Sequence, residues 1–121
     1  MSSSILNDVK KMLGIDEAIT HFDVDIIIHI NTALNTLTQI GVGPSVGFTI
    51  SDKDSTWEDF IGDDKLLSSV KTYVYIKVKL VFDPPPNSWV SETMKKNADE
   101  LEWRLNALVD VNVEENQNVE L

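Results

Sequence analysis

One short pattern in this 121-residue chain matches a catalytic motif. A G-x-S-x-G turn, which presents a nucleophilic serine in α/β-hydrolases, is matched literally by residues 43–47. In that fold a strand precedes the serine, and the acid and the histidine follow it. Here a helical pattern precedes Ser45, and both histidines, His21 and His29, come before it. The spacing therefore predicts a turn rather than a serine nucleophile, and the two histidines, eight residues apart, are expected to be structural.

A second pattern of acids resembles the start of a calcium-binding loop. Asp52 and Asp54 occupy its first and third positions. The sixth position requires glycine and holds Trp57, and the twelfth requires glutamate and holds Asp63. An acidic solvated loop is the expected structure. The residues therefore predict no metal site, no cofactor and no catalytic group, although a metal-dependent enzyme that uses the acids of 52–64 stays open as a rival hypothesis.

Composition narrows the class of protein further. The chain has no cysteine, which removes disulfides, thiolate metal sites and cysteine nucleophiles. Twenty acids against ten bases give a formal charge of −10. This charge argues against a free nucleic-acid binder and against docking on an anionic membrane, because both need a surplus of lysine and arginine. With no signal peptide and no long apolar run in view, we expect one soluble globular domain.

Hydrophobic periodicity predicts a first helix that begins near Ser4 and stops at Gly14, and a second that has Asp23 as its N-cap and ends before Gly41. No charged residue occurs from position 26 to position 51. The polar side of the second helix is therefore uncharged, and it suits either solvent or a second surface. It carries His29, Asn31, Thr32, Asn35, Thr36 and Gln39.

Residues 41–64 form a long connection with two aromatic side chains, Trp57 and Phe60, which we expect to pack onto something. The segment 66–82 is ambiguous. Its alternating β-branched and aromatic residues are typical of a strand, whereas its length and its helical spacing favour a helix slightly. The prolines at 84–86 would end such a helix.

A fourth helix is predicted from Asn87 or Ser88 to about Val109. One face carries Met94, Leu101 and Leu108, seven residues apart, and suits the core. At ~100° per residue, Trp89 and Trp103 share another side, which suits contact with a second protein or burial within the same domain. Residues 1–110 are thus expected to form a single helical domain, followed by an acidic, flexible tail at 111–121.

The candidate protein interface combines aromatic and basic side chains. The segment 65–82 has four lysines and no acid, whereas the rest of the chain sums to −14. A basic helix of this kind can face an acidic surface on a neighbour. The predicted interface residues are Trp57, Phe60, Lys71, Lys77, Lys79, Trp89 and Trp103.

Several segments form a pattern that extends from residue 5 to about residue 108. They are Lys11–Ile15, Phe22–Asn31, Gln39–Gly43, Gly47–Asp52, Trp57–Asp63, Tyr73–Pro85 and Leu101–Asn106. Together they resemble the small head–tail connector (adaptor) proteins of tailed double-stranded DNA bacteriophages and prophages. These motifs are structural rather than catalytic, and the tail after Asp110 matches no family pattern.

The resemblance implies a mostly α fold, a small bundle of about four helices with a long irregular or hairpin-like connection between the second and third. It thereby favours a helix for residues 66–82. It also implies a structural protein, not an enzyme, that forms a ring, often of twelve copies, beneath the portal. Such a ring extends the DNA channel without binding DNA specifically and docks the next neck or tail protein.

By the same resemblance, the C-terminal region would engage the portal protein, and residues 41–64 would face the channel or the tail side. The protein would be located in the virion neck, and in the host cytoplasm during assembly. The charge of −10 makes self-assembly costly and favours a monomer until the portal is present. The alternative hypothesis is a small acidic phage regulator or DNA mimic that binds a host factor.

Overall fold

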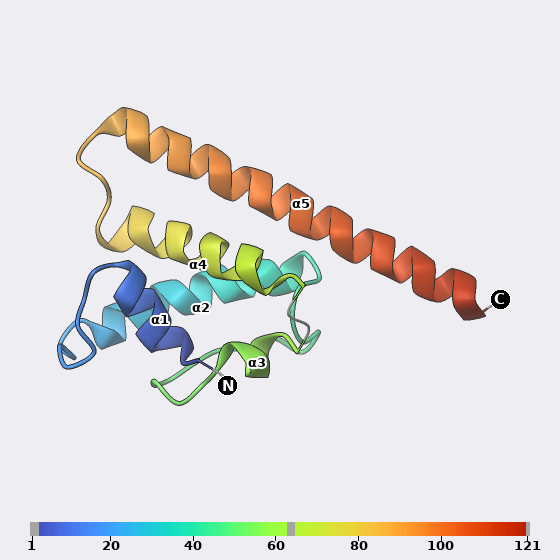
Figure 1. Ribbon diagram of the computed structural model, residues 1–121, viewed down its shortest axis with the longest axis horizontal. Helices are drawn as coiled ribbons and strands as arrows, with labels where there is room; N and C mark the ends of the chain where they lie inside the picture. Colours follow the sequence, from blue (N-terminus) through green and yellow to red (C-terminus); the bar gives the residue numbers. More distant parts are fainter. Residues whose placement is uncertain (1–2, 63–64, 121) are drawn as a thin grey trace.

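The computed structural model describes residues 3–62 and 65–120, with side chains up to Val109. Helices dominate these ranges, and their only β-type pairing is an isolated bridge between Ser4 and Thr56. The predicted mostly α class and the bundle of about four helices are confirmed, with one further short helix inside the connection (Figure 1). The helices are α1 (Ile5–Met12), α2 (Asp23–Gln39), α3 (Trp57–Phe60), α4 (Leu67–Phe82) and α5 (Ser88–Glu120).

Helix α4 lies at the centre of the bundle. It packs against α2 on one side and α5 on the other, and α1 contacts both α2 and α4 (Figure 1). Its buried residues therefore point in several directions, as expected of a helix with neighbours all round. This position explains the ambiguous pattern at 66–82, which the structure shows to be a helix that ends at Phe82, just before the prolines. The buried residues of α4 are Val70, Tyr73, Val74, Ile76 and Val78.

The N-cap of α1 is the residue that the sequence predicts, whereas the N-cap of α2 is not. The Ser4 side chain accepts a hydrogen bond from the backbone N–H of Asn7 at 3.2 Å and so caps α1 as expected. The prediction that Asp23 is the N-cap of α2 was wrong. The N-cap is Phe22, whose side chain has no atom that could accept a hydrogen bond. The Asp23 carboxylate pairs with Lys10 Nζ at 2.9 Å.

Helix α5 begins at Ser88, as predicted, but continues past the predicted end near Val109 to Glu120. The sequence after Pro86 contains no glycine or proline to stop a helix. The side chains of the predicted acidic tail at 111–121 lie outside the described residues, and its flexibility stays a prediction. Among the helices of the described chain, none is long and apolar enough to cross a membrane.

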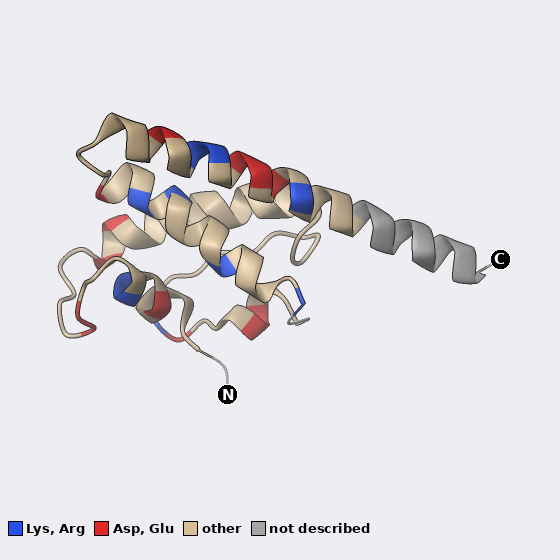
Figure 2. Ribbon diagram, turned by 45° about the horizontal axis from the view of Figure 1, so that its top comes forward, with Lys and Arg blue, Asp and Glu red and all other residues tan. Residues whose placement is uncertain are grey.

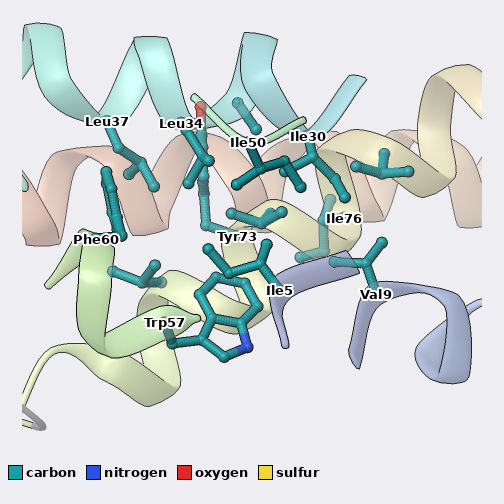
Figure 3. Packing of buried hydrophobic residues seen from close by; sticks show 14 of the residues in the cluster. Ile5, Val9, Ile30, Leu34, Leu37, Ile50, Trp57, Phe60, Tyr73 and Ile76 are labelled. Carbon is teal, nitrogen blue, oxygen red and sulfur yellow. The ribbon is translucent and has the colours of Figure 1, made fainter. Parts of the chain in front are cut away.

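The hydrophobic core lies where α1, α2, α4 and the connection meet. Figure 3 shows Trp57 and Phe60 pointing inward among Ile5, Leu37 and Tyr73. The connection between α2 and α4 thus folds back onto the bundle and supplies two of its largest buried side chains. At ~25 cal/mol per Å² of apolar surface, aromatic groups of this size dominate the stabilisation of a small core.

Candidate protein interface

Two of the seven predicted interface residues belong to the core. The side chains of Trp57 and Phe60 are only 1% and 2% exposed, so neither is available to a second molecule. The indole N–H of Trp57 donates to Asp8 Oδ2 at 2.8 Å, and the Phe60 ring lies 5.5 Å from that of Phe48. The interface prediction was wrong for these two aromatics because the surface onto which the connection packs is its own domain.

The predicted basic face of α4 is largely neutralised within the chain. Lys71 lies 3.5 Å from Asp8 Oδ2 and 5.8 Å above the Trp57 ring. Lys79 pairs with Asp83 at 2.8 Å, one turn later. Lys77 borders one of two separate hollows between α4 and α5, and this one is not the hollow described below. Contact of these three lysines with a neighbouring molecule stays a prediction.

The two tryptophans of α5 are the large aromatic side chains that stand out on the described surface. Trp89 is 74% exposed and Trp103 is 73% exposed. The core side of the same helix packs against α4 through Ala98 and Leu105, which are both buried. Helix α5 therefore has two apolar faces, as its sequence indicates, and only one of them is used within the domain.

A small hollow lies between α4 and α5, on a different side of α5 from Trp103. It has a volume of about 210 Å³. Ile76 and Leu101 supply apolar wall, and Arg104 at its edge pairs with Glu100, one turn earlier, at 2.6 Å. Charged residues of both signs alternate along this part of α5 (Figure 2). The hollow is lined by Thr72, Ile76, Asn97, Glu100, Leu101 and Arg104.

The uncharged face of α2 has a divided role. Asn31 donates to the backbone carbonyl of Ile50 at 2.9 Å and accepts from its N–H at 2.7 Å, so it fixes the connection to α2. The Thr32 hydroxyl donates to a carbonyl of its own helix, while Asn35 and Gln39 are exposed. Part of this face thus serves the fold, and the rest is open surface.

Lys10 is a structural residue that the sequence analysis missed. Its side chain is 1% exposed, and Nζ lies 2.9 Å from Asp23 Oδ1. The same ammonium donates to the carbonyls of Glu17 at 3.1 Å and Ile19 at 2.6 Å. The buried ammonium therefore has one ion-pair partner and two carbonyl acceptors. The available signal was its position four residues after Leu6, on the apolar side of α1.

Tyr73 is a second buried polar group without a predicted role. Its hydroxyl is buried near the side chains of Thr36 and Glu102, but it makes no well-formed hydrogen bond to the described residues. Burial, with a contribution from the Glu102 carboxylate on α5, raises the pKa of Tyr73 above its ordinary value. This raised pKa keeps the phenol neutral in a region where α2, α4 and α5 come together.

The residues that resembled catalytic motifs have structural roles. Gly43 has φ +87°, and a Cβ atom there would lie 2.5 Å from the ring of Phe60. The N–H of Gly47 donates to the carbonyl of Pro44 at 2.9 Å, which closes a turn around the exposed Ser45. The two glycines of the G-x-S-x-G match are therefore explained by backbone conformation and packing.

The acidic segment that starts at Asp52 also has a local explanation. The carboxylate of Asp52 accepts a hydrogen bond from the N–H of Asp54 at 2.8 Å, as in a common turn. In the described ranges, no group of three or more histidine, cysteine, aspartate or glutamate side chains could hold a metal ion. Asp63, which the calcium-loop comparison used, lies outside the described residues.

Comparison with known proteins agrees with the expectation from sequence. A family model described as "Phage connector protein" matches residues 5–112, a range that includes α1 to α4 and most of α5. No curated protein and no solved structure matches the chain. Because the family match covers nearly the whole chain, this protein belongs to the phage connector protein family.

Proposed function

We propose that this protein is a structural head–tail connector of a tailed phage or prophage. It assembles as a ring, with twelve copies as the expected number, beneath the portal protein. The ring extends the DNA channel and presents the docking surface for the next neck or tail protein. Its site of action is the virion neck, with the host cytoplasm as its location during assembly.

The observation that carries this proposal is the pair of exposed tryptophans on α5, in a chain that matches the connector family. Tryptophan is among the residues most enriched at the centres of protein–protein contacts. Trp89 and Trp103 leave about three quarters of their side-chain surface in water, although the protein has a core that accommodates Trp57 fully. Surface of this kind supports a role in binding other proteins.

Charge supports assembly on a template rather than free in solution. A net charge of −10 on each copy opposes contact between copies through repulsion. Binding to the portal would hold copies side by side and offset that repulsion. An acidic channel wall would also repel DNA, which suits passage of the genome without specific binding.

Sedimentation of the protein with and without purified portal protein tests the proposal. We expect a complex with the portal that contains many copies, and a monomer or weakly associating species alone. A tight one-to-one complex with a host protein and no portal binding would favour the acidic regulator. Calorimetric binding of magnesium, manganese or calcium with a raised melting temperature would favour the metal-dependent enzyme.

The variant Trp103→Glu gives a sharper test of the proposed interface. Because Trp103 is 73% exposed, the charged variant should keep its helical circular dichroism signal and lose multicopy binding to the portal. Thr93→Glu, on the exposed surface of the same helix, is the matched control and should bind normally. Loss of helix signal in Trp103→Glu would show instead that this side chain belongs to the core.

A further inference from the structure

Trp103 and the hollow between α4 and α5 lie on different sides of one helix. At ~100° per residue, Trp103 is between about 60° and 160° around the α5 axis from the lining residues of that helix, which are Asn97, Glu100, Leu101 and Arg104. A projecting side chain and a recess on different flanks cannot meet within one copy. They can meet between neighbouring copies if one surface of each copy binds a different surface of the next. Such contacts close into a ring when the rotation between successive copies adds up to a full turn.

We propose that Trp103 of one copy inserts into the α4–α5 hollow of the next copy around the ring. This inference rests on the proposed ring assembly and specifies which two surfaces form the contact. The occupant of the hollow is thus a second copy of this chain.

The hollow has the size and the chemistry for an indole ring. Its volume of about 210 Å³ equals roughly seven water molecules at ~30 Å³ each, comparable to the nine non-hydrogen atoms of indole. Ile76 and Leu101 supply apolar wall, and the Arg104 guanidinium can stack on an aromatic face. The amide oxygen of Asn97 can accept the indole N–H, which a buried tryptophan needs to satisfy.

Ring symmetry favours Trp103 over Trp89 as the inserted side chain. Neighbours in a closed ring are related by rotation alone, with no rise along the ring axis. If α5 runs along that axis, the projecting residue and the hollow must lie at the same height on the helix. Trp103 is within the stretch 97–104 that lines the hollow, whereas Trp89 lies eight residues before this stretch begins, or ~12 Å at 1.5 Å per residue.

Charged side chains lie beside both surfaces. Asp99 is exposed one turn before Trp103 and so lies next to it on the helix surface. Arg104 lies at the edge of the hollow, where Glu100 of its own copy holds it through an exposed ion pair at 2.6 Å. In the proposed contact, Asp99 of one copy approaches the Arg104–Glu100 pair of the next, so charge adds little and the indole in the hollow supplies most of the stabilisation.

Thiol crosslinking tests the contact directly, because the chain has no cysteine of its own. Asp99→Cys places one thiol next to Trp103, and Thr72→Cys in the same chain places another in the lining of the hollow. We treat the double variant with a short bismaleimide, both concentrated and bound to the portal protein. The expected result is a ladder of covalent oligomers, since each copy is linked to the next.

A second pair of cysteine substitutions serves as the control for this experiment. Glu92→Cys with Thr72→Cys places the first thiol beside Trp89 instead, and it should give no ladder. A ladder of oligomers from this control pair would overturn the Trp103 contact. So would copies of the Asp99→Cys, Thr72→Cys variant that bind the portal and stay uncrosslinked. Neither result would contradict the proposed ring. Failure to bind the portal or to self-associate at all overturns the proposed function, and the contact with it.

Truncation of the two tryptophans gives an independent readout. Trp89 and Trp103 are almost equally exposed, so their alanine variants should have similar monomer stability. Trp103→Ala should weaken self-association or multicopy portal binding at least tenfold, and Trp89→Ala much less. Thr72→Trp, which fills the hollow from within its own copy, should reproduce the loss seen for Trp103→Ala. Equal effects of both alanine variants would contradict the proposal.

Discussion

Replacement of Lys10 by methionine is the most informative test of the fold. The change keeps an unbranched apolar stem of similar length and removes only the buried ammonium. That ammonium holds the Asp23 carboxylate and two backbone carbonyls of the loop between α1 and α2. Without it, the carboxylate loses its ion-pair partner in a partly buried position.

The expected cost follows from burial of the two partners. Removal of one member of a fully buried ion pair costs about 3–5 kcal/mol. The Asp23 side chain is 24% exposed, so water can recover part of the lost interaction, and we expect a loss of about 2–3 kcal/mol. For a domain of this size, that loss lowers the melting temperature by roughly 8–12 °C.

Urea denaturation followed by circular dichroism measures this loss. Lys11→Met is the matched control, because Lys11 is exposed one residue further along the same helix and should change stability by less than about 0.5 kcal/mol. Adding Asp23→Asn to Lys10→Met removes the stranded charge and should restore about half of the loss. A cost below about 0.5 kcal/mol for Lys10→Met would refute the assigned role of the ion pair.

Five further substitutions, two of them for comparison, test the polar contacts and the turn by the same urea assay. Asn31→Ala removes both hydrogen bonds to the connection and should cost about 2 kcal/mol, against less than ~0.5 for the exposed Asn35→Ala. Tyr73→Phe removes a buried hydroxyl that has no well-formed hydrogen bond and should stabilise by up to ~1 kcal/mol. Because the folded pKa of Tyr73 is raised, wild-type stability should fall as the pH rises above the unfolded pKa of about 10, and less so in Tyr73→Phe. Gly43→Ala should cost about 2–3 kcal/mol and Gly47→Ala about 1 kcal/mol, since both have positive φ but only the first would meet a ring.

The helical elements could be predicted from local patterns, and the failures have a local cause. Ser4 caps α1 and Gly14 follows it because capping depends on neighbours a few residues away in the sequence. Asp23 has the right residue type for an N-cap but is engaged by Lys10, thirteen residues earlier. A tertiary ion pair of this kind leaves no signal in helix periodicity.

The exposure of the predicted interface residues could be predicted only in part because residue type does not report burial. Trp57 and Trp103 are the same side chain, yet one is 1% and the other 73% exposed. For α5, a helical wheel separates Trp103 from the core face, so periodicity within this long helix was sufficient to place Trp103 on another side. Trp57 lies in a four-residue helix, too short to establish a face, and its burial depends on how the connection folds back. The hollow combines two helices, which no single-helix pattern could reveal.

The distribution of charge bears on how copies of this protein come together. Several cations are paired with acids of their own chain, so they contribute less to contacts between copies; these are Lys10, Lys71, Lys79 and Arg104. Repulsion between copies of charge −10 acts over the Debye length of about 8 Å at physiological salt. Insertion of an indole into an apolar hollow stabilises only at contact. Copies therefore repel before they can bind, and a template that holds them adjacent changes this balance, which is the role that the proposed function gives to the portal.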